Sequence, residues 1–254
     1  MSAPAESADS VVIAGRYRGP PGSGNGGYTC GLLAAGMPMP VEVTLKQPPP
    51  LDRPLKVLQI GEDRVLMDDG EHIAEARRST LDLLPPPCPG LGAATEAAAR
   101  YRGLEEHAFP GCFVCGTDRA PGDGLRVFAG EVSGGMGGQE TCEGLVACPW
   151  KPSAELAGPD GRVRPEFTWA ALDCPGAWAW LHELENPLVL GRLTVAASAP
   201  VMAGRPHIVG GWRLGREGRK HYSGTVIWRA DGTPCMRARA TWIEIDAARF
   251  AAAG

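Results

Sequence analysis

The stretch most suggestive of chemistry runs from Gly19 to Ala34 and reads GPPGSGNGGYTCGLLA. A glycine-rich loop here leads into a short apolar segment closed by Gly36 and Pro38, which predicts a loop followed by a short buried helix. The first turn of a helix presents unpaired N–H groups and the positive end of the backbone dipole, and glycines let a ligand oxygen approach closely. Such a place can hold a phosphate or stabilise an oxyanion. No Gly-Lys-Ser/Thr and no clear βαβ unit follow, which argues against nucleotide-binding loops. A flexible loop capping an ordinary core helix is the alternative.

Two cysteine pairs raise the question of a metal site. Cys112 and Cys115 have the separation found in zinc sites, and Cys142 and Cys148 are the candidate partners. The second pair has five residues between its members, and no histidine follows at zinc-finger spacing. We therefore expect a structural turn at the first pair, no metal and no cofactor.

The composition excludes several classes of function. The formal net charge is −4 and there is no basic run, so binding of nucleic acid is not expected. No apolar run reaches membrane-spanning length, and the polar N-terminus MSAPAESADS lacks the features of a signal peptide. We expect a cytoplasmic protein that keeps its cysteines reduced and does not contact a membrane. Within it, Cys30 and Cys174 are interpreted as small apolar residues on buried helices rather than as nucleophiles.

The hydrophobic pattern predicts mostly strands in the first half of the chain. The predicted strands are Val11–Tyr17, Val41–Leu45, Leu55–Ile60, Arg64–Met67 and His72–Leu83. The centre of the last segment, AEARR, is equally compatible with a helix. The proline-rich run 85–90 predicts a stiff linker, Ala93–Tyr101 predicts a short helix, and a second unit is expected to begin at Phe109.

An internal repeat indicates how these elements are organised. In each half a helix is followed by an extended strand, a proline-marked bend, another strand, an Asp-Gly turn and a long final strand. Asp69-Gly70 corresponds to Asp231-Gly232, and Ala76 corresponds to Ala238. The pattern predicts a duplicated unit of one helix and an antiparallel sheet. The expected boundaries are 10–84 for the first unit, 85–108 for the linker and short helix, and 109–246 for the second unit.

Two segments of the second half resemble a known family. Cys112-Phe-Val-Cys-Gly116, followed by Gly122-Asp-Gly-Leu-Arg-Val-Phe128, is similar to the start of small thioesterases related to phenylacetyl-CoA hydrolases. Val163-Arg-Pro-Glu-Phe-Thr-Trp-Ala-Ala-Leu-Asp173 resembles their central helix, which carries an acid. The sequence thus resembles the hotdog-fold thioesterase superfamily over nearly its whole length. The resemblance implies an α+β fold, a tandem (double) hotdog with two antiparallel sheets that each wrap a central helix. We expect the two sheets to join into one long sheet with both helices on one side.

The resemblance also implies roles for individual residues. In this family one unit supplies a helix N-terminus, commonly His-Gly-Gly, whose N–H polarises the thioester carbonyl, and the other supplies the acid. Here Asn25, Gly26 and Gly27 match the first motif and Asp173 matches the acid, while Ala34 and Arg164 stand at the complementary positions. One composite site is therefore expected, with Asp173 facing the loop across a pocket as general base or nucleophile.

Further residues are expected to assist at that site. Thr194 is the nearest match to a water-positioning hydroxyl, and Tyr28 and Trp169 are expected to contact the substrate. Arg216 and Lys220 belong to a basic hairpin that could contact the phosphates of coenzyme A. Core packing of the aromatic residues and a solvated turn are the alternatives. Glu166 is a weaker candidate for a second acid, because a carboxylate is favourable at any helix N-terminus.

The leading hypothesis is an acyl-CoA thioesterase that converts acyl-CoA, or another acyl thioester, to an acid and a free thiol. A homodimer of double-hotdog chains is compatible with this hypothesis. A hotdog dehydratase or hydratase and a non-catalytic protein that binds acyl-CoA or a small ligand are the alternatives. The sequence leaves open the acyl group, the carrier and the oligomeric state.

Overall fold

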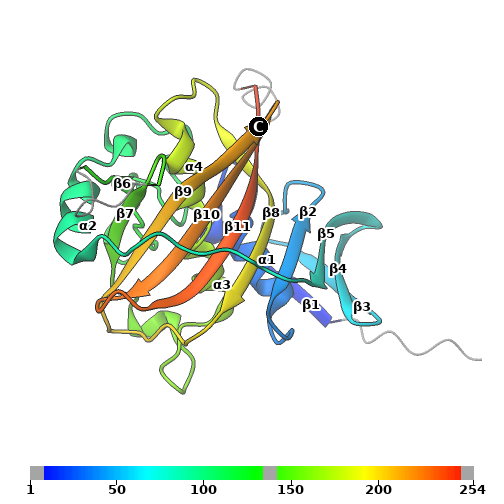
Figure 1. Ribbon diagram of the computed structural model, residues 1–254. Coiled ribbons are helices and arrows are strands. Elements are labelled where there is room, and N and C mark those ends of the chain that lie inside the picture. The colour runs from blue at the N-terminus through cyan, green and yellow to red at the C-terminus, as the bar shows by residue number, and fades with distance from the viewer. Residues whose placement is uncertain (1–8, 134–141, 247–254) are drawn as a thin grey trace, which may run out of the picture.

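The computed structural model describes residues 9–133 and 142–246, which form a large sheet with helices on both faces (Figure 1). The strands are β1 (Asp9–Val12), β2 (Val41–Leu45), β3 (Pro54–Ile60), β4 (Asp63–Asp68), β5 (Glu71–Arg78), β6 (Gly130–Glu131), β7 (Val146–Trp150), β8 (Leu188–Ala197), β9 (His207–Glu217), β10 (Lys220–Arg229) and β11 (Pro234–Glu244). The α-helices are α1 (Gly26–Ala34), α2 (Gly90–Ala99), α3 (Pro165–Ala171) and α4 (Cys174–Leu181). Short 3₁₀ turns lie at η1 (Gly15–Tyr17), η2 (Arg102–Leu104) and η3 (Ala154–Leu156).

The described strands form one sheet rather than the two sheets named in the expected fold. Its 11 strands run in the order β1-β3-β4-β5-β2-β8-β11-β10-β9-β7-β6. The two halves of the chain meet where β2 pairs antiparallel with β8, with Val43 opposite Leu193. Both of these side chains are fully buried. The expected joining of the two halves into one long sheet is therefore what the structure has.

The strand order runs the same way outward from this junction in both halves. On one side β2 is followed by β5, β4, β3 and β1, and on the other β8 is followed by β11, β10, β9 and β7. In each half a helix precedes the first strand of the series, and the Asp-Gly turn precedes the strand that pairs with it. Gly70 and Gly232 both have φ near +90°, a conformation that favours glycine. The two Asp-Gly turns thus occupy corresponding places in the strand order.

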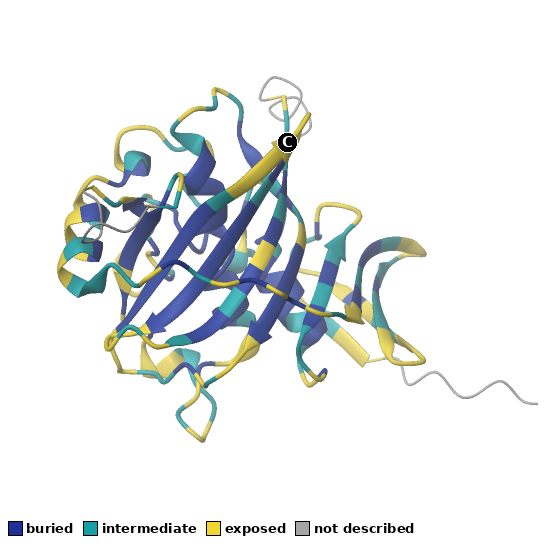
Figure 2. Cartoon of the chain, viewed as in Figure 1, coloured by how far each residue is buried: buried dark blue, intermediate teal, exposed yellow. Residues whose placement is uncertain are grey.

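The helices α1, α3 and α4 pack on one face of the sheet, behind the strands in Figure 1. The opposite face is covered by the segment 79–89, which crosses in front of β9, β10 and β11, and by α2. Leu81 and Leu83 of that segment are buried with Trp212 and Trp228 of the sheet. Figure 2 shows the result: the central strands are mostly buried, while β3 and β4 at one edge carry exposed residues.

Some predicted element boundaries were wrong. The strand predicted for Val11–Tyr17 is the shorter β1, because the chain turns into η1. The strand predicted for His72–Leu83 ends at Arg78, and its apolar residues beyond that point pack on the face of the sheet instead of pairing. Helix α2 begins at Gly90, three residues before its predicted start. The strand Val41–Leu45 was confirmed.

The helix that resembles the family's acid-bearing helix is broken just before its acid. Helix α3 ends at Ala171, and α4 begins at Cys174. Pro175 lacks an N–H and its ring would clash with the carbonyl four residues earlier, so a continuous helix is not accessible. Asp173 lies in the break, with φ −77° and ψ −82°, as the residue that precedes α4.

Across the described residues, every helix is too short or too polar to span a lipid bilayer.

Candidate active site

Asn25 links the start of α1 to Asp173. Its Oδ1 accepts a hydrogen bond of 2.9 Å from the backbone N–H of Tyr28, which is the usual contact of a helix N-cap. This bond fixes the orientation of the amide, so Nδ2 points the other way. There it donates to Asp173 Oδ2 at 2.9 Å. The backbone N–H of Gly27 donates to the same oxygen, also at 2.9 Å.

The close approach of these groups requires glycine in α1. A Cβ on Gly27 would lie 2.6 Å from both Asp173 Cβ and the carbonyl oxygen of Trp169. Glycine therefore lets the Gly27 N–H reach the Asp173 carboxylate directly. The sequence predicted that Asp173 faces this loop across a pocket, and that geometry was wrong: the Gly27 N–H and the Asp173 carboxylate are in direct contact.

Asp173 is almost completely buried, at 2% exposed. Its Oδ1 is buried as well and has no hydrogen-bond partner among the described residues. Burial is the main cause that raises the pKa of Asp173 from 3.8 to about 7; the nearby Cys112 acts in the same direction, and the hydrogen bonds from Gly27 and Asn25 oppose the shift. A carboxyl group with a pKa in this range can take up or release a proton near neutral pH.

Asp173 and the α1 N-terminus form part of the wall of one apolar pocket of about 390 Å³. Asn25 and Gly26 line it from the first half of the chain, and Asp173 from the second. Apolar side chains from both halves supply most of the remaining wall, including Leu45, Trp178, Leu181, Leu190 and Trp242. The volume is in the range of small-molecule binding sites.

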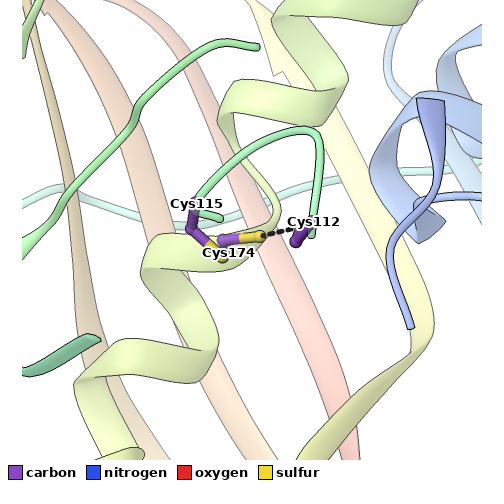
Figure 3. Close-up of side chains that lie close together, drawn as sticks. All are labelled: Cys112, Cys115 and Cys174. Atoms are coloured by element: carbon purple, nitrogen blue, oxygen red, sulfur yellow. Dashed lines mark hydrogen bonds between the residues drawn. The ribbon is translucent and has the colours of Figure 1, made fainter. Parts of the chain in front are cut away.

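Three cysteines lie side by side in the same pocket wall (Figure 3). The sulfur atoms of Cys112, Cys115 and Cys174 lie within 4.8 Å of one another, and all three residues are buried. The Cys112 and Cys174 sulfurs are 3.8 Å apart. Hydrogen bonds from the Cys115 and Cys174 thiols lower the pKa of Cys112. Asn25 Nδ2 also lies 3.8 Å from the Cys112 sulfur, so the cysteines adjoin the Asn25–Asp173 pair.

His107 also lines the pocket, but both of its ring nitrogens are engaged by the backbone. Nδ1 accepts a hydrogen bond from Phe109 N–H at 3.0 Å, and Nε2 lies 3.1 Å from the carbonyl oxygen of Cys115. The arrangement requires a proton on Nε2 and none on Nδ1, which is the neutral imidazole. Burial lowers the pKa of His107 and favours the same form.

The structure brings together only some of the residues selected from the sequence. Asn25, Gly26 and Asp173 line the pocket, and Gly27 contacts Asp173 behind it. Thr194 does not line it; its hydroxyl donates to Glu42 Oε2 at 3.1 Å across the junction of β2 and β8.

The predicted substrate-binding residues lie away from the pocket wall. Tyr28 is buried and stacks on Tyr17, with ring centroids 4.2 Å apart. Trp169 is fully buried and faces a separate, smaller cavity. Arg216 and Lys220 are exposed near the β9–β10 hairpin. In the pairing of β10 with β11, however, Lys220 is opposite Ile243, and Ile243 lines the pocket.

His107 and the cysteine cluster were not predicted from the sequence as parts of the pocket. The sequence did contain a pattern that relates two of the pocket residues: Cys174 and Trp178 are four residues apart, so they lie on the same face of a helix. Nothing in the sequence linked Cys174 to Cys112, which is 62 residues away.

The sequence matches no protein-family model and no curated protein. Similar solved structures do exist. A conserved protein of unknown function with a hotdog fold from Alicyclobacillus acidocaldarius has a TM-score of 0.59 at 12% identity, over 96% of this chain and 95% of that one. The chain has a hotdog-type fold.

Other hotdog-like structures of similar extent carry thioesterase names. A candidate thioesterase II from Thermobifida fusca YX has a TM-score of 0.60 at 13% identity, over 94% of this chain and 92% of that one. A candidate thioesterase from Novosphingobium aromaticivorans has a TM-score of 0.59 at 15% identity, over 96% of this chain and 100% of that one. At these identities the similarity establishes a shared hotdog-type fold.

Proposed function

We propose that this hotdog protein hydrolyses acyl thioesters at a single site built from both halves of the chain. The observation that carries the proposal is Asp173: one carboxylate oxygen is held by Asn25 and Gly27, and the other has no protein partner, in the wall of an apolar pocket. Thioesterase names among proteins of the same fold support the choice of reaction.

We further propose that the chain is a tandem hotdog, with units at about 10–84 and 109–246 joined by the linker 85–108. The matching strand orders on the two sides of the β2–β8 junction support this duplication. Under this interpretation the first unit supplies the helix N-terminus and the second supplies the acid. Ala34, the residue at the acid position of the first unit, leaves the duplicated fold with one complete site.

In the proposed reaction Asp173 acts as a general base through Oδ1. It takes a proton from a water molecule while the water oxygen bonds to the thioester carbonyl carbon. The tetrahedral intermediate then collapses, the carbon–sulfur bond breaks, and the departing thiolate takes the proton from Asp173. The products are a carboxylic acid and a thiol, so atoms and charge balance.

The carbonyl oxygen needs a donor as negative charge develops on it. Gly26 is the first residue of α1 and lines the pocket, and the N–H of a first helical residue has no acceptor within its own helix. We assign this N–H as the oxyanion donor, because the Gly27 N–H is already bonded to Asp173. Loss of one such donor typically costs about 3 kcal/mol of transition-state stabilisation.

The apolar wall suits the acyl chain, and the charged part of the carrier needs a polar exit. Lys220 at the β9–β10 hairpin is opposite Ile243 of β11, and Ile243 lines the pocket. Arg216 and Lys220 of that hairpin are exposed and are assigned to the phosphates of coenzyme A. The substrate class is therefore acyl-CoA with an apolar acyl group.

Binding without hydrolysis is the second candidate function. It is favoured by the direct bond between Gly27 N–H and Asp173, which removes one expected carbonyl donor, and by the position of Thr194 outside the pocket. A dehydratase is less well supported, because such enzymes rely on a histidine with an acid. Among the described residues of the pocket wall, His107 is the one histidine, and both of its ring nitrogens are bonded to the backbone.

A panel of acyl-CoA substrates tests the proposal. Release of coenzyme A is measured by chromatography, since the protein's own cysteines would react with a thiol reagent. We expect turnover by the wild-type protein and at least a 100-fold lower rate for Asp173→Asn. Glu166→Gln is the matched control: this acid is in α3 outside the pocket wall, paired with Arg164 at 2.8 Å, and its loss should leave the rate unchanged. Equal rates for Asp173→Asn and wild type would overturn the assignment of Asp173.

A further inference from the structure

The spacing of the three clustered sulfurs matches what a metal ion requires. A tetrahedral zinc site with Zn–S bonds of about 2.3 Å places its sulfur atoms about 3.8 Å apart. The Cys112 and Cys174 sulfurs are 3.8 Å apart, and all three pairs lie within 4.8 Å. Small side-chain movements would therefore bring three thiolates around one ion.

The backbone holds two of these cysteines in a turn that only glycine can close. The Gly116 N–H donates to the Cys112 carbonyl oxygen at 2.9 Å. A Cβ on Gly116 would lie 2.4 Å from the carbonyl oxygens of Cys112 and Pro110. The sequence Cys-x-x-Cys-Gly is thus built to present two sulfurs on one side.

Polar groups adjoin two of the sulfurs. The amide nitrogen of Asn25 lies 3.8 Å from the Cys112 sulfur. Cys174 is the first residue of α4, where the helix dipole and free N–H groups stabilise negative charge. A buried group of three thiolates and a divalent cation would carry a charge of −1, which these donors partly compensate.

We propose that Cys112, Cys115 and Cys174 bind one soft d¹⁰ metal ion, with Zn²⁺ as the best fit. Three thiolates select Zn²⁺ or Cu⁺ over hard cations such as Mg²⁺. The three residues line the pocket, so the fourth coordination position opens into it, as in zinc sites that keep one exchangeable ligand. Asp173 lies outside the group of sulfurs and keeps its own contacts with Asn25 and Gly27.

The sequence expectation of no metal rested on the wrong partners. It paired Cys112 and Cys115 with Cys142 and Cys148, and neither of these belongs to the cluster. The third cysteine comes from the start of α4, which the fold brings against the turn (Figure 3).

Metal titration of the full chain tests the site. The protein is reduced, freed of metal with a chelator and titrated anaerobically with Co²⁺ and then Zn²⁺. We expect one equivalent to bind, with thiolate-to-cobalt charge-transfer bands that Zn²⁺ abolishes. Cys112→Ala and Cys174→Ala should each weaken binding by more than about 100-fold, beyond the loss typical of outer-shell changes. Cys148→Ala, at a buried cysteine outside the cluster, should bind as the wild type does.

Protection from alkylation tests the site without any variant. With Zn²⁺ bound, mass spectrometry should find Cys112, Cys115 and Cys174 protected from iodoacetamide under conditions that expose them in the metal-free protein. Absence of saturable binding, protection of other cysteines instead, or undiminished binding by folded Cys174→Ala would overturn the proposal. Neither readout involves a substrate, so the result is independent of whether the protein hydrolyses thioesters.

Discussion

At the scale of residues, the side-chain amide of Asn25 makes two separate contacts. Its oxygen caps α1 and its nitrogen holds the Asp173 carboxylate. The two contacts are coupled, because the cap fixes which end of the amide faces the acid. A side chain that only capped the helix would leave one buried oxygen of Asp173 with one hydrogen-bond donor fewer, which is unfavourable.

Substitutions of Asn25 should separate the contribution of the helix cap from that of the contact with Asp173. Asn25→Ala removes both contacts, and we expect the free energy of unfolding to fall by about 2 kcal/mol. Asn25→Ser keeps a capping oxygen but is too short to reach Asp173, so it should cost about 1 kcal/mol less. Both variants should slow the release of coenzyme A. Urea denaturation and the chromatographic assay provide the measurements. Equal stability of the two variants would show that the cap contributes little.

At the scale of elements, α1 and α3 cross closely enough that their backbones nearly touch. Gly31 of α1 faces α3, where an added Cβ would lie 2.6 Å from Glu166 Cα and 2.9 Å from the Pro165 carbonyl oxygen. The two helices come from different halves of the chain. Their close crossing is what brings the N-terminus of α1 within hydrogen-bond distance of Asp173.

Gly31→Ala should therefore destabilise the protein even though alanine favours a helix. Overpacking costs about 1–3 kcal/mol, and it must also offset a gain in helix propensity of up to about 1 kcal/mol. We expect a net loss of about 1–2 kcal/mol in urea denaturation. The control is Gly92→Ala in α2, which has open space around the added Cβ and should be neutral or stabilising. The same small gain in stability for Gly31→Ala and Gly92→Ala would contradict the close packing of α1 against α3.

The sequence predicted elements well where local patterns decide them and poorly where packing does. The alternation in Val41–Leu45 was sufficient to place β2. Residues 79–83 look like a strand, but their apolar side chains are buried against the face of the sheet, which no local pattern reveals. Pro175 does account for the break between α3 and α4, because proline is not tolerated inside a continuous helix. The cysteine cluster depends on residues far apart in the chain, so composition and spacing could not predict it.

At the scale of the whole molecule, both halves share one sheet and one main core. The β2–β8 junction continues the hydrogen bonding of the sheet, and buried residues from both halves belong to the same cluster, among them Val43, Ala76, Phe167 and Leu193. The candidate site depends on this union, since Asn25 and Asp173 are 148 residues apart in the chain.

Unfolding should therefore be a single cooperative transition. All seven tryptophans lie in residues 150–242, so their fluorescence reports on the second half alone. Hydrogen exchange of amides in β4 and β5 reports on the first half. We expect the denaturant midpoints from the two probes to coincide. A first half that loses its protection at clearly lower denaturant would show that the halves are separate cooperative units.

The most direct test of the account compares turnover and binding in Asp173→Asn. The amide keeps the shape of the carboxyl group and can still accept from Gly27 and Asn25, but it cannot take a proton. With the best substrate of the panel, we predict that kcat falls by about 10²–10⁴-fold. The Kd of a non-hydrolysable thioether analogue, measured by calorimetry, should change by less than about threefold. A kcat close to that of the wild type would contradict a catalytic Asp173, and the absence of turnover by the wild type together with tight analogue binding would favour a binding protein.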